Sequence, residues 1–351
     1  LPFNSENSDH GLLCINHEYT SEEVMFPGMG GDQKEAAFKK ITKEHVFTEM
    51  AAHGGSIVEV IKRNGRWKTV YPSLYNRRVN ALDTKMQLSG PVAGSDRVKT
   101  SADSEGRHVI GTFNNCAGGI TPWGTYLMAE ENFHGYFMGE LPKGHSETSN
   151  HTRYGVPAGA FAWGKYVDRF DLSKEPNEPN RYGWVVEVDP FNKDWHPRKR
   201  TALGRFRHEG ATAVVNKDGR VVVYSGDDSR FEYLYKFVSA RRYNPKVRIA
   251  NLNILDTGTL YVAKFHENGK VQWLPIVYGQ GPLTVKNGFK SQADVLIETR
   301  RAADLLGATP MDRPEDVETS PASGKVYVML TNNHKRKPGQ ENPANPRAEN
   351  L

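Results

Sequence analysis

The sequence predicts an all-β protein, and more narrowly a β-propeller with helical and loop insertions. Short segments in which apolar and polar residues alternate recur along most of the chain, and this period of two is typical of strands. A glycine followed closely by a strand tyrosine recurs at 219–224, 258–261 and 324–327. Strand repeats of roughly 40 residues are typical of propeller blades. A two-sheet sandwich is the alternative, but the number of predicted strands disfavours it.

The predicted strands are short, rich in β-branched or aromatic residues, and bounded by Gly, Asp, Asn or Pro. In chain order they lie at 11–16, 56–62, 66–71, 108–113, 123–130, 182–188, 212–216, 220–225, 231–238, 258–265, 270–274 and 325–331. Asn-Gly and Asp-Gly pairs predict hairpin turns at 63–66, 217–220 and 267–270.

The segments between strands complete the predicted organisation. Helical spacing of apolar residues predicts two helices, near 34–52 and 293–306, which we interpret as insertions between strands. Segments 140–181 and 333–351 are rich in Pro, Gly and polar residues and are predicted to be long surface loops. We interpret residues 1–351 as a single propeller domain.

Composition excludes several classes of protein. The formal net charge of +5 over 351 residues is too mild to call for a nucleic-acid partner. No run of about 20 apolar residues exists, so no membrane-spanning helix is expected. Two cysteines, Cys14 and Cys116, are too few for a disulfide framework or a cysteine-rich zinc module. Cys14 alternates with the apolar Leu12, so we interpret it as a core residue.

Polar side chains gather where the predicted strands begin or end. They lie in the segments 16–18, 114–116, 130–132, 208–210, 227–228 and 313–318. Equivalent strand ends of different propeller blades converge at the mouth of one central channel. The pattern therefore predicts a cluster of carboxylates at this mouth, together with one thiol, that of Cys116.

A cluster of carboxylates favours bound cations, because like charges within a few ångström raise one another's pKa. Oxygen ligands suit Ca²⁺ or a trivalent iron, and a thiolate adds a soft ligand for a transition metal. Arg313 and Arg347 have the side chain that binds phosphate through two parallel hydrogen bonds. Taken singly, these residues have ordinary interpretations: a lone Glu at a strand end is usually solvated, and a free Cys is often buried.

An ordered series of motifs runs along nearly the whole chain. It comprises Asn-His-Glu-Tyr-Thr at 16–20, Ala-His-Gly-Gly at 52–55, Asn-Asn-Cys-Ala-Gly-Gly at 114–119, Glu-Glu-Asn-Phe at 130–133, His-Glu-Gly-Ala at 208–211, Gly-Asp-Asp at 226–228, Met-Asp-Arg-Pro-Glu-Asp-Val-Glu at 311–318 and Asn-Pro-Arg-Ala at 345–348. No single motif is unique, but the ordered set resembles the PhoX-type alkaline phosphatases, a family of secreted bacterial phosphatases.

The resemblance implies a six-bladed β-propeller with ferric and calcium ions at the channel mouth. In that pattern Cys116 bridges iron ions. The other implied metal ligands are Glu18, Glu209 and Glu315 for iron, and Glu131 and Asp228 for calcium. Family members carry further chain before the first motif and after the last, so strands that close the ring are expected to lie outside this sequence.

The implied activity is the hydrolysis of phosphate monoesters, with Arg313 facing the phosphate and Arg347 as a second candidate for that role. The expected partner is a small phosphoester, without nucleic acid or a membrane span, and the protein is expected to be a monomer. The resemblance also implies twin-arginine export to the periplasm or the medium. Two alternatives stay open. One is a calcium-only propeller hydrolase of lactones or phosphotriesters, which has no need of the Cys116 thiol; the other is a non-catalytic binding propeller.

Overall fold

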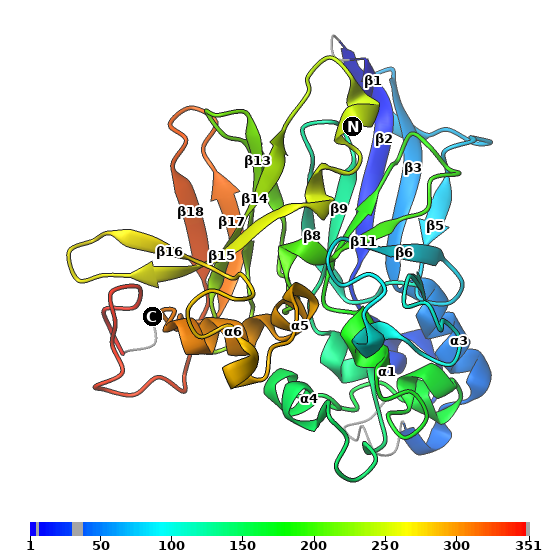
Figure 1. The fold of residues 1–351 in the computed structure, drawn as a ribbon. Coiled ribbons are helices and arrows are strands. Elements are labelled where there is room, and N and C mark those ends of the chain that lie inside the picture. The colour runs from blue at the N-terminus through cyan, green and yellow to red at the C-terminus, as the bar shows by residue number, and fades with distance from the viewer. Residues whose placement is uncertain (5–6, 30–37, 349–351) are drawn as a thin grey trace.

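The computed structural model describes residues 1–4, 7–29 and 38–348. Figure 1 shows a mostly β molecule in which the strands stand side by side and the helices gather at one end of them. The predicted excess of strand over helix is therefore confirmed. The arrangement separates the molecule into a layer of sheets and a layer of short helices and loops.

The first sheet contains the N-terminal strands. They are β1 (Pro2–Asn4), β2 (Asn7–His17), β3 (Gly54–Arg63), β4 (Arg66–Thr69) and β5 (Arg77–Val79). The order is β1-β2-β3-β4, with β5 also paired to β3. Between β3 and β4 the chain turns at Asn64 and Gly65, whose φ angles of 51° and 75° suit a tight Asn-Gly hairpin. The turn predicted at 63–66 is thus confirmed.

The second sheet lies next along the chain. Its strands are β6 (Lys85–Ser89), β7 (His108–Ile110), β8 (Asn115–Ile120), β9 (Tyr126–Glu130), β10 (Val185–Val188) and β11 (Arg198–Arg200). They follow the order β7-β6-β11-β10-β9-β8, in which β11 and β6 are parallel and the other pairs antiparallel. Strand β8 is one edge of this sheet.

Two further sheets complete the described strands. The third is an antiparallel meander of β12 (Thr212–Val215), β13 (Arg220–Gly226), β14 (Leu234–Arg242), β15 (Gly258–Phe265) and β16 (Val271–Pro275). The fourth is a hairpin of β17 (Pro314–Thr319) and β18 (Val326–Leu330). Strand β17 was not predicted as a strand. Figure 1 shows the hairpin of β15 and β16 projecting from the body of the molecule.

Strands of neighbouring sheets pack against one another in sequence order. Strand β2 contacts β8, β8 contacts β12, and β12 contacts β17. This succession brings corresponding strand ends of all four sheets together, as blades of a propeller do. The described residues form four sheets rather than six. The predicted number of six blades therefore remains a prediction.

The helices are short. They are α1 (Glu22–Met25), α3 (Lys43–Ala52), α4 (Thr148–Tyr154), α5 (Gln292–Ile297) and α6 (Thr299–Leu306). The helix predicted at 293–306 is in fact two helices, because Glu298 leaves helical geometry with φ −104° and ψ 41°. Of the helix predicted at 34–52, residues 34–37 lie outside the described residues. Within the rest, residues 38–40 are helical, the helix is interrupted at 41–42, and α3 starts after Thr42, whose hydroxyl accepts a hydrogen bond from the amide of His45.

Single turns of 3-10 helix connect many of these elements. They are Asp96–Val98, Phe133–Tyr136, Trp163–Lys165, Asp168–Phe170, Glu178–Arg181, Thr201–Leu203, Arg248–Asn251, Ile254–Asp256 and Val285–Asn287. No helix of the described residues has the length and apolar character needed to cross a bilayer.

The prediction of a surface loop at 140–181 is wrong. This segment contains α4 and three of the 3-10 turns, and its Tyr154, Trp163 and Phe170 are almost completely buried. Trp163 and Phe170 pack edge-on against Phe113, which precedes β8. The polar composition of the segment concealed these few large aromatic side chains, which bury enough area to fix it in the core.

Candidate metal centre

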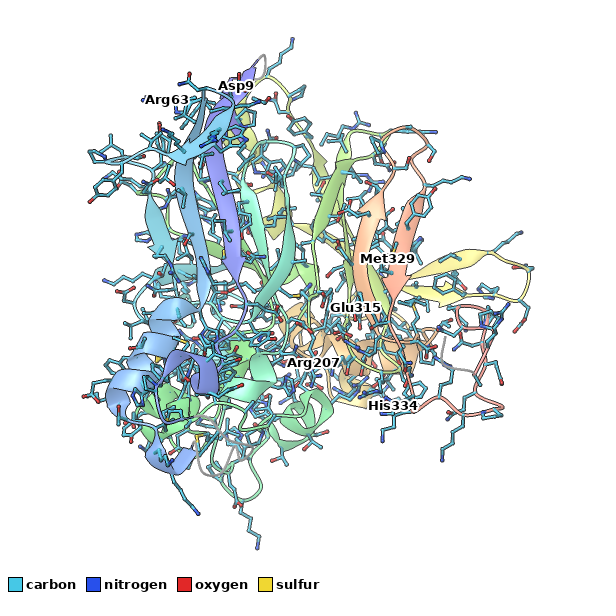
Figure 2. All side chains as sticks on the ribbon, turned by 180° about the vertical axis from the view of Figure 1, so that it is seen from behind. Asp9, Arg63, Arg207, Glu315, Met329 and His334 are labelled. Atoms are coloured by element: carbon cyan, nitrogen blue, oxygen red, sulfur yellow. The ribbon has the colours of Figure 1, made fainter. Side chains whose placement is uncertain are left out.

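The predicted metal ligands lie where these packed strands or their partner strands begin or end. Glu18 follows β2, Cys116 is the second residue of β8, Glu209 precedes β12, and Glu315 is the second residue of β17. The other two, Glu131 and Asp228, follow β9 and β13, the partner strands of β8 and β12. In Figure 2, Glu315 lies near the helical end of the strands, while Asp9 and Arg63 mark the opposite end.

Two groups of side chains come close enough to bind a cation. Glu18, Cys116 and Glu131 form one group, and Glu131, Glu209 and Asp228 form the other. Within each group the potential ligand atoms lie within 4.8 Å of one another. Since Glu131 belongs to both, the two groups form one continuous cluster. The structure thus brings together five of the six predicted ligands.

Backbone hydrogen bonds between sheets hold the ligands in place. The amide of Ala117 donates to the carbonyl of Glu209 at 2.8 Å, and the amide of Glu209 donates to Gly226 at 3.2 Å. The thiol of Cys116 donates to the Glu209 carboxylate at 3.1 Å. A side chain at Gly226 would meet the carbonyl of Glu315 at 2.3 Å, so only glycine lets β17 approach β13 this closely.

The electrostatics of the cluster are those of uncompensated acids. Burial, with the charges of Glu209 and Asp228, raises the pKa of Glu131 to about 9. Burial and the nearby charge of Glu315 raise the pKa of Glu209 to about 7 although the Cys116 thiol donates to it, and burial raises the pKa of Glu18. The pKa of Cys116 is raised first by burial and then by the Glu209 carboxylate.

These residues fit a resident cation. Within each of the two groups the carboxylate or thiol ligand atoms lie within 4.8 Å of one another in a partly buried space. A bound positive charge would offset the burial and the repulsion that raise their pKa values. The donor set combines hard oxygens with one soft sulfur and contains no histidine. Such a set suits calcium at its oxygen-only side and a transition metal beside the sulfur.

Arg313 lies directly beside this cluster. Its guanidinium donates to both oxygens of Asp228, at 2.9 and 2.7 Å, and lies 2.9 Å from Glu315. The bonds to Asp228 raise the pKa of Arg313. Glu315 also accepts a hydrogen bond from the hydroxyl of Thr331, so it borders the two close groups without belonging to them. Arg313 has a φ of 24°, an uncommon backbone geometry for a residue with a side chain.

Arg347, the second predicted phosphate-binding residue, is not brought to the cluster. It is exposed and makes no hydrogen bond or ion pair with the described part of the chain. The neighbouring Asn345 is held instead, because it donates to Asp312 at 2.9 Å. No contact therefore links the predicted role of Arg347 to the site.

Sequence reasoning missed residues that support the cluster. Asn16 donates to the carbonyls of Cys116 and Ala117, both at 2.8 Å, and so ties the end of β2 to β8. The guanidinium of Arg207 lies within electrostatic reach of Glu131, and its buried Nε has no partner among the described residues. Asn16 and Arg207 each stand two residues before a predicted ligand. This proximity in the sequence is the signal by which they could have been found.

His208 has a structural role. Its two ring nitrogens bond Ser225 and the carbonyl of Gly204, both at 2.9 Å, and burial lowers its pKa to about 4. A neutral imidazole with both nitrogens engaged in this way has no free lone pair for a cation. The motif that contains Glu209 therefore contributes only its carboxylate to the cluster.

The fold and site define a mostly β protein with a candidate metal centre built from several sheets and an arginine beside it. Residues 2–351 match the family model for alkaline phosphatase PhoX, so the chain belongs to that family. The solved structure of Pseudomonas fluorescens PhoX in complex with vanadate, a transition state analogue, is similar to this chain with 44% identity and a TM-score of 0.90. The similarity covers 99% of this chain and 60% of that one. A comparison with curated proteins found no match.

Proposed function

We propose that the protein hydrolyses phosphate monoesters and releases inorganic phosphate. The observation that carries this proposal is the convergence of carboxylates and one thiol from separate sheets next to Arg313. Family membership supports it, as does the similarity to a PhoX solved with a transition state analogue. An arginine beside a cluster of cations is suited to a substrate with several negatively charged oxygens.

We infer that residues 1–351 form a single β-propeller domain. The complete ring of such a domain would have six blades. The successive packing of β2, β8, β12 and β17 supports this inference. The chain spans 60% of the length of the solved PhoX chain. The predicted small-molecule substrate, monomeric state and location in the periplasm or medium, reached by twin-arginine export, belong to the same proposal and rest on the family.

We propose iron and calcium as the bound metals. Cys116, Glu18, Glu209 and Glu315 would hold Fe³⁺, and Glu131 and Asp228 would hold Ca²⁺. When bound, such ions supply Lewis-acid polarisation of the phosphoryl oxygens and activate the attacking nucleophile.

The protein's own residues supply orientation. Asp228 and Glu315 fix the guanidinium of Arg313 before the substrate binds, so little conformational entropy is lost when it meets a phosphate. The side chain is one-third exposed, at 33%, and is thus accessible from solvent. In this proposal Arg313 would donate hydrogen bonds to phosphoryl oxygens as negative charge develops on them.

The test combines metal content with activity. Protein purified without chelator would be analysed by mass spectrometry for metals, by visible absorption, and for hydrolysis of p-nitrophenyl phosphate at alkaline pH. Glu315→Gln should lose activity, whereas Glu318→Gln, an exposed carboxylate on the same strand, should retain it. Iron and calcium with phosphatase activity support the proposal. Calcium alone with lactone or phosphotriester hydrolysis would replace it, and metal-free inactive protein would indicate a binding role.

A further inference from the structure

A buried chain of hydrogen bonds runs from α3 to the metal cluster. Nδ1 of His53, the residue after α3, lies 2.7 Å from the carbonyl of Glu49. Its Nε2 lies 2.9 Å from the hydroxyl of Tyr136, and that hydroxyl lies 3.0 Å from Nδ2 of Asn114. His53 and Tyr136 are fully buried and Asn114 nearly so. Three segments far apart in sequence are thereby connected.

Chemistry fixes the direction of each bond in this chain. A carbonyl oxygen only accepts, so Nδ1 of His53 must carry the proton that points to Glu49. Burial lowers the pKa of His53 to about 4, so the ring is neutral and Nε2 accepts. Tyr136 then donates to His53 and accepts from the amide of Asn114. Burial raises the pKa of Tyr136 well above its usual value, so its proton stays in place.

The rings in this chain have little freedom to rotate. The imidazole of His53 meets Tyr136, Phe161 and Trp163 edge-on, with ring centroids 5.2, 5.4 and 4.9 Å apart. Tyr136 stacks on Phe161 at 4.5 Å with an interplanar angle of 6°. A side chain held on several faces keeps one rotamer, so the hydroxyl of Tyr136 has a fixed position.

Asn114 connects the fixed hydroxyl of Tyr136 to the segments that carry the candidate metal ligands. With its Nδ2 directed at Tyr136, its Oδ1 accepts from the amide of Asn132 at 2.7 Å. Its main-chain carbonyl accepts from the amide of Glu131 at 2.9 Å. Asn114 has a φ of 50°, and Cys116 follows two residues later. This single turn therefore fixes the backbone position both at the end of β9 and at the start of β8.

We propose that His53 and Tyr136 are positioning residues, which lock the Asn114 turn and thereby hold Glu131 and Cys116 in the geometry that binds cations. The proposal rests on the metal centre of the proposed function. Neither residue contacts the cluster, so both act through Asn114. Partners of this kind, one step behind the ligands, typically change metal affinity by about 10- to 100-fold when they are removed.

The test is the affinity of chelator-treated protein for Ca²⁺ alone, measured by isothermal titration calorimetry. Tyr136→Phe removes one hydroxyl and keeps the ring, and we expect the dissociation constant to rise by about 10- to 100-fold. Tyr182→Phe is the matched control, because both tyrosines pack on Phe113, with ring centroids 4.4 and 4.3 Å away, and both are fully buried. The control should bind Ca²⁺ as the wild type does.

A second variant covers the case in which Tyr136→Phe does not fold. Asn114→Gly keeps the positive φ accessible and removes the amide, so it should weaken Ca²⁺ binding to a similar extent. In iron-loaded protein, both variants should also shift the visible absorption band relative to Tyr182→Phe.

The outcomes separate the two proposals. Wild-type affinity in folded Tyr136→Phe overturns the positioning role, and so does wild-type affinity in Asn114→Gly if Tyr136→Phe fails to fold. An equal loss of affinity in Tyr182→Phe also overturns it, since the effect would then be one of general packing. A wild-type protein that binds neither Ca²⁺ nor iron would instead remove the metal centre itself.

Discussion

The guanidinium of Arg313 and the carboxylate of Asp228 form two parallel hydrogen bonds, of 2.9 and 2.7 Å. Asp228 also belongs to the group of candidate cation ligands that contains Glu131 and Glu209. One carboxylate therefore serves both the candidate anion-binding arginine and the candidate cation site. Because the two bonds fix the plane of the guanidinium, any change that moves the cluster will also move Arg313.

Arg313→Lys tests this relationship. Lysine keeps the charge but cannot make two parallel bonds to Asp228, so the cation is no longer held in one orientation. We expect kcat/KM for p-nitrophenyl phosphate to fall by about 10²- to 10³-fold, with the metal content unchanged. The matched control is Arg248→Lys, which breaks a similar pair with Asp189, of 2.8 and 2.7 Å, at a distance from the cluster. Equal activities of the two variants would contradict the role of Arg313.

Cys116→Ser tests the thiol. Serine keeps the size of the side chain and removes the soft ligand, so iron content should fall by at least about tenfold while calcium is retained. Cys14→Ser is the control, because the pKa of Cys14 is raised to about 11 by burial and Cys14 is outside both cation-binding groups. Metal analysis by mass spectrometry and the visible spectrum measure the effect. Retention of iron and of the visible band in Cys116→Ser would show that the sulfur is not a ligand.

Glu131→Gln tests the raised pKa of this carboxylate in the cluster. The pKa of Glu131 rises from 4.5 to about 9 in the folded protein, mainly through burial. Between these values the folded protein holds a proton that the unfolded chain releases, so stability falls as pH rises, by up to about 1.4 kcal/mol per pH unit. Glutamine does not ionise. Metal-free Glu131→Gln should therefore be more stable than metal-free wild type, increasingly so from about pH 5 to about pH 9.

Urea unfolding at several pH values in the presence of a chelator measures this difference. With metal bound, the order should reverse, because the wild type gains binding energy that the variant lacks. A stability difference between Glu131→Gln and wild type that stays constant with pH would contradict the raised pKa.

The sequence predicts the strands in which apolar residues alternate over a long stretch, such as β2, β3 and β13. It does not predict β11, whose three residues are Arg198, Lys199 and Arg200. Lys199 and Arg200 are fully buried, and their charges are paired with carboxylates on β9 and β10 of the same sheet. A hydrophobic pattern cannot show that a charged residue has a buried partner elsewhere in the chain, so the strand looks like an exposed segment.

The candidate site shows the same contrast. Strand ends and ordered motifs predict the residues of the cluster, because ligands adjacent to β-strands leave a local signal. The contact between His53 and Tyr136 joins residues 83 positions apart, so it leaves no local signal in the sequence. Between the adjacent carboxylates Glu130 and Glu131, the pattern also gives little guidance. The structure separates them, since Glu131 faces the cluster and Glu130 faces a buried lysine.

Glu130→Gln tests that separation. The carboxylate of Glu130 is fully buried, accepts a bond of 2.7 Å from Lys199, and also accepts from Thr112 and from the amide of Trp184. Its removal takes the ion-pair partner from buried Lys199, so we expect a loss of about 3–5 kcal/mol in the free energy of unfolding. The folded fraction should still bind metal, in contrast to Glu131→Gln. The double variant Glu130→Gln/Lys199→Met should recover part of the stability, because it removes the unpaired charge as well. If Glu130→Gln instead kept its stability and lost its metal, Glu130 rather than Glu131 would be the ligand of this pair.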